Sequence, residues 1–469
     1  MTKIKFGTDG WRSVIAKDFT VDNVARISEG ASKWLINKND NLSVVIGHDC
    51  RFGGPLFADT AARIFLNNNI KVYLAKGFVS TPMISMAALH LKTGLGVIIT
   101  ASHNPYTDNG YKLKGHYGGP LMEDDIHAVE ELIPDNNDYD LDKICLKEYE
   151  KKGLLEYVDI ETMYCDYLEE KFDLEMIKNS GLQFAFDAMY GSGQNVMRRL
   201  FPDITLLHCE HQPLFDYISP EPLLRNLGEM AETIKLAEDI DCGLAIDGDA
   251  DRIALFNHKG DYIDSHHILL ILIHYLHKYK KMDGKVATGF SSTQKIKTLC
   301  KLYNLPLEIV KIGFKHICGL MLTENILVGG EESGGIAVAG HIPERDGIYN
   351  GILIWEFLAK TGKSLQDIIE EIYKLTGSFA FERSDLRIPE KEKQRIVKNC
   401  QDGAYKSFGK HVVERIETLD GFKYYFNDDE WLMIRPSGTE PVLRTYAESH
   451  TKEKALEILK AGYDTIMQK

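Results

Sequence analysis

GVIITASHNP, residues 96–105, joins a short apolar run to a polar, turn-forming end. The run predicts a buried strand, and functional groups in open α/β sheets lie beyond the carboxyl ends of strands. The Ser102 hydroxyl is therefore expected at such an end, with His103 as a donor beside it. Pro105 favours an extended conformation at Asn104, which keeps a helix from beginning at once. The competing interpretation is an ordinary loop in which Ser and Asn form local turns.

The alternation of apolar runs and helical patterns continues through most of the chain. Strands are expected at 44–46, 72–74, 97–99, 183–187, 204–208, 242–246, 285–289, 307–310 and 326–329. Helices are expected at 55–67, 82–91, 192–200, 228–238, 264–280, 292–303 and 314–323. This spacing indicates parallel or mixed sheets covered by helices, in three similar α/β domains.

The last ninety residues have a different pattern, with closely spaced strands and two flanking helices. The strands are expected at 412–413, 424–426, 431–434 and 443–446, and the helices at 390–400 and 451–467. This pattern indicates an α+β domain with an antiparallel sheet. From charged, turn-rich segments and changes of pattern we place the four domains at 1–155, 156–259, 260–376 and 377–469.

Composition narrows the class of protein. The chain has 469 residues, of which 44% are hydrophobic and 26% charged, as in ordinary globular proteins. Its net charge of −14, without a basic run, makes nucleic acid or an anionic membrane a poor partner. No apolar run approaches the roughly 20 residues that cross a bilayer, and the first residues lack a secretory pattern. The 8 cysteines form no C-x-x-C pair, which favours reduced thiols and a cytoplasmic location.

DGDADR, residues 247–252, follows a second apolar run and places three aspartates at alternate positions. Three carboxylates so close together repel one another unless a cation joins them, and Mg²⁺ prefers such oxygen ligands. An EF-hand calcium loop is excluded because its sixth and twelfth positions hold Arg252 and His258. The alternatives that remain are a solvated acidic turn and a phosphatase with Asp247 as nucleophile. The phosphatase would require a Thr where this chain has Asp251.

Two further loops carry groups suited to a sugar phosphate. GEESG at 330–334 presents carboxylates and a hydroxyl on a glycine-rich backbone, which suits neighbouring sugar hydroxyls. RPSGTEP at 435–441 concentrates phosphate-binding groups, and Arg444 can join them from the next strand. Each loop taken alone also fits an ordinary polar turn. Basic side chains in other loops complete the set: Arg12, Arg51, Lys112 and Lys315.

The combination resembles the α-D-phosphohexomutase family across essentially the whole chain. The motifs that carry the resemblance occur in order at 6–12 (FGTDGWR), 100–105, 247–252, 330–334 and 435–441. The resemblance implies four domains around one central cleft. It implies that Ser102 is phosphorylated and that Mg²⁺ is held by a phosphoserine oxygen and the three aspartates, Asp247, Asp249 and Asp251. It also implies that Glu331 and Ser333 bind sugar hydroxyls, and that the remote phosphate is bound by Arg435, Ser437, Gly438 and Thr439.

The implied reaction moves phosphate reversibly between O1 and O6 of a hexose through a hexose 1,6-bisphosphate. Phosphoryl transfer depends mainly on positioning and charge neutralisation, which Mg²⁺ with Arg12 or Arg252 can supply. A base must take the hydroxyl proton, and Lys112 and Lys315 both match positions proposed for this role. His103 is a further substrate-binding candidate. The partner expected is a small phosphosugar, and the oligomeric state, monomer or homodimer, stays open.

Two departures from the family pattern bear on the substrate. Ile312 stands where a Thr often precedes the Gly-x-Lys element, and Glu332 and Gly335 stand where dual-specificity relatives have Met and His. Glu332 favours a phosphoglucomutase over glucosamine-phosphate mutases, whose loop typically has Gln there, and activity on mannose phosphates stays open. The alternatives kept are a glucosamine- or pentose-phosphate mutase, an aspartyl phosphatase and a catalytically silent sugar-phosphate-binding protein.

Overall fold

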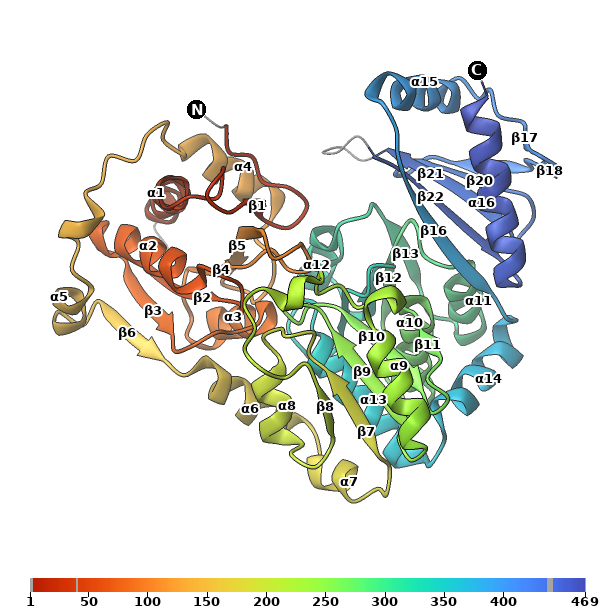
Figure 1. Cartoon of the computed structure of the whole chain (residues 1–469), viewed down its shortest axis with the longest axis horizontal. Coiled ribbons are helices and arrows are strands. Elements are labelled where there is room, and N and C mark those ends of the chain that lie inside the picture. The colour runs from red at the N-terminus through yellow and green to blue at the C-terminus, as the bar shows by residue number, and fades with distance from the viewer. Residues whose placement is uncertain (1–2, 39–40, 437–441, 469) are drawn as a thin grey trace.

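The computed structural model describes residues 3–38, 41–436 and 442–468. The chain forms three α/β units and a C-terminal α+β unit, each built on its own main sheet (Figure 1). This arrangement confirms the fold class expected from the sequence. None of the helices within the described ranges is long and apolar enough to span a membrane.

The first sheet has the strand order β1-β5-β4-β2-β3-β6. Its strands are β1 (Trp11–Val14), β2 (Ser43–His48), β3 (Lys71–Ala75), β4 (Leu95–Ile99), β5 (Asp108–Gly115) and β6 (Leu155–Val158). The helices of this unit are α1 (Val21–Lys38), α2 (Gly54–Asn67), α3 (Thr81–His90), α4 (Glu123–Leu132) and α5 (Leu146–Lys151). β4 is parallel to β2 and antiparallel to β5, so the sheet is mixed. Every residue of β4 is buried, and the strand therefore delivers the Ser102 loop into the interior.

The second sheet has the order β11-β10-β9-β7-β8 and is also mixed, because β9 is parallel to β7 and antiparallel to β10. Its strands are β7 (Phe184–Asp187), β8 (Thr205–Leu207), β9 (Cys242–Ile246), β10 (Ile253–Asn257) and β11 (Tyr262–Ile263). Its helices are α6 (Ile160–Lys171), α7 (Leu174–Lys178), α8 (Gln194–Leu200) and α9 (Gly228–Ala237). The aspartate loop is the turn between β9 and β10.

The third sheet has the order β13-β12-β14-β15. Its strands are β12 (Lys285–Gly289), β13 (Leu307–Val310), β14 (Ile326–Gly330) and β15 (Ile336–Val338). Its helices are α10 (Ser265–His274), α11 (Gln294–Tyr303), α12 (Phe314–Thr323), α13 (Gly347–Thr361) and α14 (Leu365–Thr376). The single helix expected over 264–280 is α10 followed by a π-helical turn, Tyr275–Tyr279.

The C-terminal sheet has the order β16-β22-β21-β20-β19, and all its neighbouring strands are antiparallel, as expected. Its strands are β16 (Ala380–Arg387), β19 (Arg415–Glu417), β20 (Phe422–Tyr425), β21 (Trp431–Pro436) and β22 (Val442–Ser449). β17 (Ser407–Phe408) and β18 (His411–Val412) pair separately, and the helices are α15 (Glu390–Gln401) and α16 (Lys452–Met467).

Local signals and tertiary context both decide where elements form. α3 begins where the sequence predicts, because the Ser80 hydroxyl accepts the Met83 N–H at 3.2 Å and Pro82 stands in the first turn. β5 was not anticipated, because its sequence DNGYKLKG has no apolar run. Lys112 and Lys114 are nevertheless fully buried in this strand, where carboxylates from other loops pair with them.

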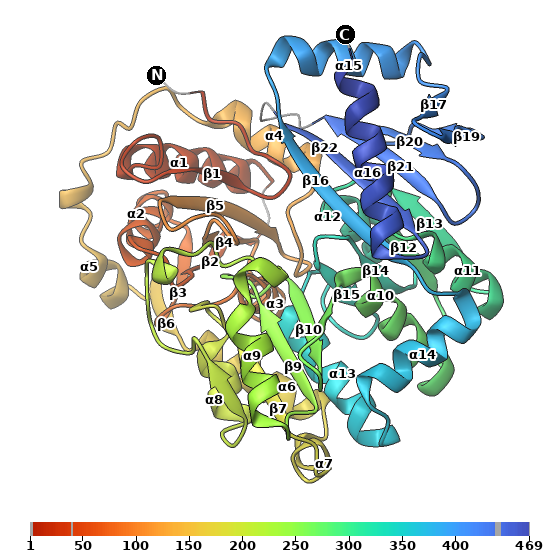
Figure 2. The same cartoon turned by 45° about the vertical axis from the view of Figure 1, so that its right-hand side comes forward.

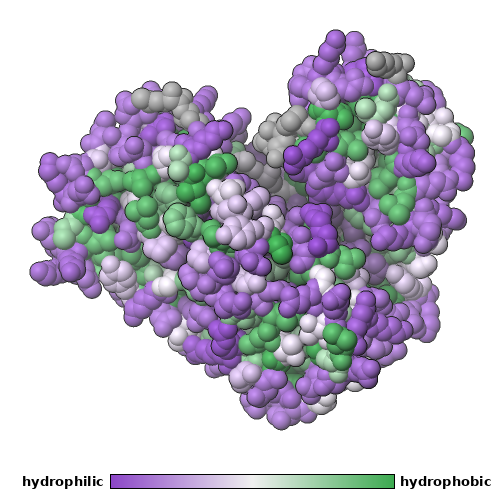
Figure 3. All heavy atoms as spheres, in the orientation of Figure 1, coloured by the Kyte–Doolittle hydropathy of each residue, from purple (hydrophilic) through white to green (hydrophobic). Residues whose placement is uncertain are grey.

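The four units surround a hollow. Figures 1 and 2 place the first and C-terminal units as two lobes above the second and third units, and Figure 3 shows the surface hollowed between the lobes. One cluster of buried apolar side chains runs continuously through the first three units, including Val45, Leu244 and Trp355. The C-terminal unit has its own core around Leu432 and Ile458. The loops discussed below meet where these units adjoin.

Candidate active site

Ser102 lies in the loop after β4 in a strained backbone conformation. Its φ of 53° is left-handed, which costs a non-glycine residue on the order of 1 kcal/mol. The Ser102 N–H donates to the Thr100 hydroxyl at 2.9 Å, and the Arg51 guanidinium donates to the Ser102 carbonyl. Only 1% of the residue is exposed. The surrounding hydrogen bonds therefore hold this serine in a conformation that it would rarely adopt alone.

The Ser102 hydroxyl meets the aspartate loop of the second unit. Its Oγ donates to Asp247 Oδ2 at 2.7 Å, while His103 Nδ1 lies 3.4 Å from the same Oγ. The approach depends on Gly248, where a Cβ would lie 2.7 Å from the Ser102 carbonyl oxygen. The structure thus brings together the two motifs that the sequence placed 145 residues apart.

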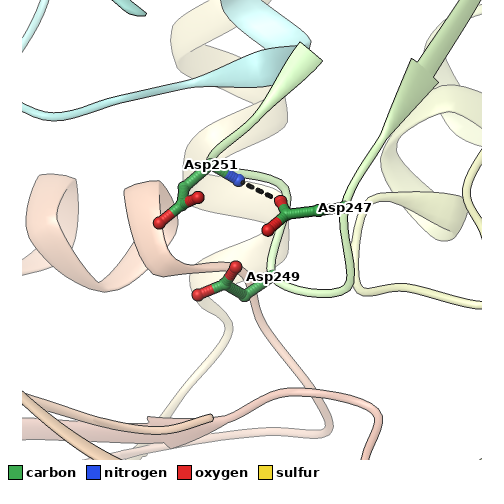
Figure 4. Close-up of side chains that lie close together, drawn as sticks. All are labelled: Asp247, Asp249 and Asp251. Atoms are coloured by element: carbon green, nitrogen blue, oxygen red, sulfur yellow. Dashed lines mark hydrogen bonds between the residues drawn. The ribbon is translucent and has the colours of Figure 1, made fainter. Parts of the chain in front are cut away.

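Asp247, Asp249 and Asp251 form a buried carboxylate triplet (Figure 4). One oxygen from each lies within 4.8 Å of the others, and Asp247 Oδ1 accepts the Asp251 N–H at 2.9 Å. Asp249 Oδ1 and Asp251 Oδ1 are buried and have no hydrogen-bond partner in the described part of the chain. Buried oxygens without partners are costly unless a cation or water satisfies them. The triplet therefore fits a hard divalent cation such as Mg²⁺.

Cations neutralise the opposite oxygens of the same carboxylates. Lys112 Nζ lies 2.8 Å from Asp249 Oδ2, 3.2 Å from Asp251 Oδ2 and 2.8 Å from Asp9 Oδ2. Arg345 Nη2 lies 2.8 Å from Asp251 Oδ2 and also pairs with Asp9. These contacts occupy the Oδ2 atoms and leave the Oδ1 atoms of Asp249 and Asp251 for another ligand.

Burial and mutual repulsion shift the acidity of the triplet. Burial raises the pKa of Asp247 well above its ordinary value, and the charges of Asp251 and Asp249 raise it further. Burial also opposes ionisation of Asp249, but Lys112, the Thr81 hydroxyl and Arg12 together outweigh it and lower the pKa of Asp249. Burial, followed by the charge of Arg252, holds the pKa of His103 well below its ordinary value, so the neutral imidazole is favoured. A cation in the triplet would favour the ionised form of all three carboxylates.

Two arginines border the same site. Arg12 Nη1 donates to the Asn104 side-chain oxygen at 2.9 Å, which places it beside the serine loop. Arg252 Nε lies 4.0 Å from Asp247 Oδ2 and 3.9 Å from Asp251 Oδ1, too far for hydrogen bonds. Arg252 Nε is buried without a hydrogen-bond partner among the residues described. Within the described residues neither guanidinium group is held by a hydrogen bond to the triplet, so both charges remain available to an anion bound at this site.

The sugar-loop candidate is joined to the aspartate loop through the backbone. Ile253 donates its N–H to the Gly334 carbonyl at 3.2 Å, and Arg252 forms a β-bridge with Gly335. Glu331 is buried and accepts the Gly313 N–H at 2.6 Å, whereas Ser333 is half-buried. Burial, reinforced by the charge of Glu332, raises the pKa of Glu331 to about 7. This loop therefore lies beside the aspartate loop.

Lys315 lies in the first turn of α12, two residues after Gly313. Its Nζ is 2.7 Å from Glu123 Oε1 of α4, and no contact joins it to Ser102 or to the triplet within the described residues. The neighbouring Ile312 N–H donates to Asp420 Oδ2 at 2.9 Å. Asp420 Oδ1 accepts from Arg435 Nε at 3.1 Å. Asp420 thus links the Gly313 region to the C-terminal loop.

Arg435 and Arg444 lie directly opposite each other on β21 and β22. Like charges in this position repel, and Arg444 Nε is buried without a hydrogen-bond partner within the described ranges. An anion between them would relieve the repulsion. The remaining phosphate-loop candidates, Ser437, Gly438 and Thr439, lie outside the described residues.

Several residues of the site were not assigned from the sequence. They are Asp9, Glu344, Arg345, Asp420 and Thr81, whose hydroxyl donates to Asp249 Oδ2 at 2.5 Å. Asp9 stands inside the FGTDGWR motif, which was considered only for its basic residue Arg12, so the motif itself could have indicated Asp9. Arg345 and Glu344 stand between two elements without any motif, and only folding places Arg345 against Asp251 and Glu344 2.6 Å from Lys114.

Comparison with known proteins identifies the family of the chain. Models of the phosphoglucomutase/phosphomannomutase family match four successive regions. The α/β/α domains I, II and III match residues 3–140, 162–260 and 264–376, and the C-terminal domain matches residues 386–463. The chain belongs to this family. It is therefore a phosphohexomutase, and phosphohexomutases are isomerases.

Relatives within the family carry different substrate names. A phosphoglucomutase/phosphomannomutase from Thermococcus kodakarensis is 29% identical, and the match covers 97% of each chain. A phosphoglucosamine/phosphogalactosamine mutase from Sulfurisphaera tokodaii is 28% identical over 96% of each chain. The crystal structure of a Thermus thermophilus protein, assigned as a phosphomannomutase, matches with a TM-score of 0.86 and 29% identity over 100% of both chains.

Proposed function

We propose that this mutase moves phosphate reversibly between O1 and O6 of a hexose, converting glucose 1-phosphate to glucose 6-phosphate. Activity on mannose phosphates stays open and is decided by the assay below. The observation that carries the proposal is the 2.7 Å hydrogen bond from Ser102 Oγ to Asp247 Oδ2. It unites the hydroxyl that would carry phosphate with the carboxylates that would neutralise it. A phosphoserine at Ser102 would act as donor, and a hexose 1,6-bisphosphate would be the intermediate.

The first step would transfer the phosphoryl group from Ser102 to the free sugar hydroxyl. The sugar oxygen forms a bond to phosphorus, the bond from phosphorus to Ser102 Oγ breaks, and the hydroxyl proton passes to a base. Asp247, Asp249 and Asp251 would hold Mg²⁺, which would neutralise charge on the phosphoryl group. Arg12 and Arg252, which border the same site, would also stabilise this charge.

Two lysines remain candidates for the base. Lys112 lies beside the triplet, where Asp249 and Asp251 hold its ammonium group. Lys315 pairs with Glu123 and would have to leave that contact to reach the reacting groups. A base must lie within hydrogen-bond reach of the proton it takes. We therefore place Lys112 nearer to the reaction than Lys315. Burial opposes the charge of Lys112, but Asp249, Asp251 and Asp9 together raise the pKa of its ammonium group, so Lys112 would have to lose a proton before it could act as the base.

The rest of the substrate would lie along the line of loops that leads to the C-terminal unit. Glu331 and Ser333 would bind sugar hydroxyls, and His103 would contact the substrate near Ser102. Arg435 and Arg444, with Ser437, Gly438 and Thr439, would hold the phosphate that is not transferred. The bisphosphate would then turn end for end within the cleft, so that its other phosphate returns to Ser102.

A second candidate is a mutase of amino-sugar phosphates. Relatives named phosphoglucosamine mutase include the protein of Staphylococcus carnosus, 27% identical over 99% of this chain. The adjacent carboxylates of Glu331 and Glu332 could also pair with an ammonium group. Ser291 holds Glu332 through a 2.5 Å hydrogen bond, so the position of that carboxylate is fixed. A pentose-phosphate mutase is the remaining alternative for the substrate.

The test compares four substrates at equal concentration in coupled assays with Mg²⁺: glucose-, mannose-, glucosamine- and ribose-1-phosphate. We expect the largest kcat/KM with glucose 1-phosphate, and a dominant rate with glucosamine or ribose phosphate would replace our choice. Intact-mass measurement and peptide mapping should find an adduct of about 80 daltons on Ser102. Release of inorganic phosphate with a label on Asp247 would instead indicate a phosphatase. Binding without turnover or adduct would indicate a silent sugar-phosphate-binding protein.

A further inference from the structure

Arg51 is a buried arginine in the loop between β2 and α2, and only 2% of it is exposed. Its side chain lies beneath the serine loop without reaching the proposed substrate site. Nε donates to Asp49 Oδ2 at 3.1 Å. The other four N–H groups are directed at backbone carbonyls of the serine loop: those of Ser102, Asn104 at 3.1 Å, Pro105 at 3.0 Å and Asp108 at 3.0 Å.

All five donors of the guanidinium are thus used, four of them by one loop. Backbone carbonyls that converge on one point repel each other unless a donor group lies between them. A planar guanidinium offers five N–H groups in a fixed fork, whereas a lysine ammonium offers three around a single nitrogen. No other common side chain can therefore hold this set of carbonyls in the same arrangement.

Asp49 extends this support to the strand end. Its Oδ2 accepts the Thr100 hydroxyl at 2.5 Å, and the Thr100 hydroxyl oxygen accepts the Ser102 N–H at 2.9 Å. Ser102 is therefore fixed on both sides, through its N–H by the Asp49–Thr100 pair and through its carbonyl by Arg51. This double attachment accounts for the left-handed φ of 53° that directs the serine side chain at Asp247.

A second arginine offers a comparison within the same unit. Arg63 of α2 also donates to loop carbonyls, those of Leu141 at 2.9 Å and Ile144. That loop precedes α5 and takes no part in the proposed site. Arg63 therefore represents the purely structural use of a guanidinium under a loop.

We propose that Arg51 is a positioning residue for phosphoryl transfer. It sets the direction of Ser102 Oγ by donating hydrogen bonds to four backbone carbonyls within residues 102–108. The proposal rests on the proposed function of Ser102 as the phosphate carrier. Besides the serine loop and Asp49, the Arg51 guanidinium lies 4.9 Å from the centre of the Phe215 ring of the second unit. Because none of these contacts involves the candidate sugar loop or the candidate remote-phosphate loop, loss of Arg51 should slow the transfer steps and leave the binding of the sugar and its remote phosphate intact.

The experiment compares Arg51→Lys and Arg51→Ala with Arg63→Lys and Arg63→Ala. For the Arg51 variants we expect kcat to fall about 100-fold, as for other displacements of about 1 Å in reacting groups, with KM within about threefold of wild type. Both Arg63 variants should keep kcat within about twofold of wild type, even where their thermal midpoints fall as far as those of the Arg51 variants. Added guanidinium ions should restore kcat of Arg51→Ala at least about tenfold, whereas ammonium ions should not.

Hydrogen exchange supplies a readout that does not depend on activity. Amides of residues 100–110 should exchange faster in both Arg51 variants than in wild type, and remain protected in the Arg63 variants. Faster exchange with no mutase activity in any protein, wild type included, would refute the proposed function while retaining the role of Arg51 in the loop. Unchanged exchange, a kcat loss equal to that of the Arg63 variants, or rescue by ammonium would overturn the proposal.

Discussion

Glu331 should make the protein less stable at high pH than its glutamine variant. Glu331 is 5% exposed, and its carboxyl group accepts one strong hydrogen bond, from the Gly313 N–H. Burial raises its pKa from an ordinary 4.5 to about 7, and the Glu332 charge adds to the shift. In Glu331→Gln the amide oxygen can still accept the Gly313 N–H, but the group carries no charge at any pH.

The size of the effect follows from the difference in pKa. Below pH 4.5 the carboxyl is protonated in both the folded and the unfolded chain and contributes nothing. Between pH 4.5 and 7 the unfolded chain ionises while the folded chain keeps its proton, so the free energy of unfolding falls as pH rises. One pKa unit corresponds to about 1.4 kcal/mol, so the loss should reach about 3 kcal/mol above pH 7.

Urea denaturation of wild type and Glu331→Gln at about pH 5 and about pH 8 measures this difference. We expect the variant to be more stable by about 3 kcal/mol at the higher pH and by less than about 1 kcal/mol at the lower pH. Glu232→Gln, at an exposed position on α9, serves as control and should give the same small change at both pH values. Equal stability of wild type and Glu331→Gln at the higher pH, or a less stable variant, would refute the reasoning. The variant should also have a lower kcat/KM at the higher pH, since the ionised carboxylate would bind the sugar hydroxyl.

Three further substitutions test other contacts. Ser102→Ala should unfold near the wild-type temperature, lose more than about 1,000-fold in activity and show no phosphoryl adduct; a rate near wild type would exclude a phosphoserine intermediate. Asp420→Ala removes the carboxylate that holds Arg435 in position for the remote phosphate. Steady-state kinetics should therefore show KM raised about tenfold with kcat nearly unchanged, and a loss confined to kcat would contradict this. Gly248→Ala places a Cβ 2.7 Å from the Ser102 carbonyl oxygen, so kcat should fall at least about tenfold; unchanged kcat would show that the loops can separate freely.

Apolar runs predicted most of the parallel strands because these strands are buried on both faces. The runs at 97–99 and 242–246 became β4 and β9, and all residues of both strands are buried. β5 escaped prediction for the opposite reason. Its lysines are buried only because Asp9, Asp249 and Glu344 arrive from other parts of the chain to pair with them.

The site shows the same division. Ser102 and the aspartate triplet were identifiable because unusual polar motifs follow apolar strands directly. Arg345 and Asp420 carried no such signal, and their roles arise from contacts with Asp251 and Arg435 across unit boundaries. A residue that acts through a partner distant in sequence has no local pattern by which it can be recognised.

The order of residues was enough to establish the α/β repeats, the antiparallel C-terminal sheet and the succession of loops that carry chemistry. These features depend on the periodicity of neighbouring side chains, which is a local property. The folded arrangement was needed to show that Ser102 Oγ meets Asp247, that Lys112 pairs with the triplet and that Lys315 turns to Glu123. Such contacts depend on how separate sheets pack together. The free energy of that packing comes from the whole core, so no single segment of the sequence reveals it.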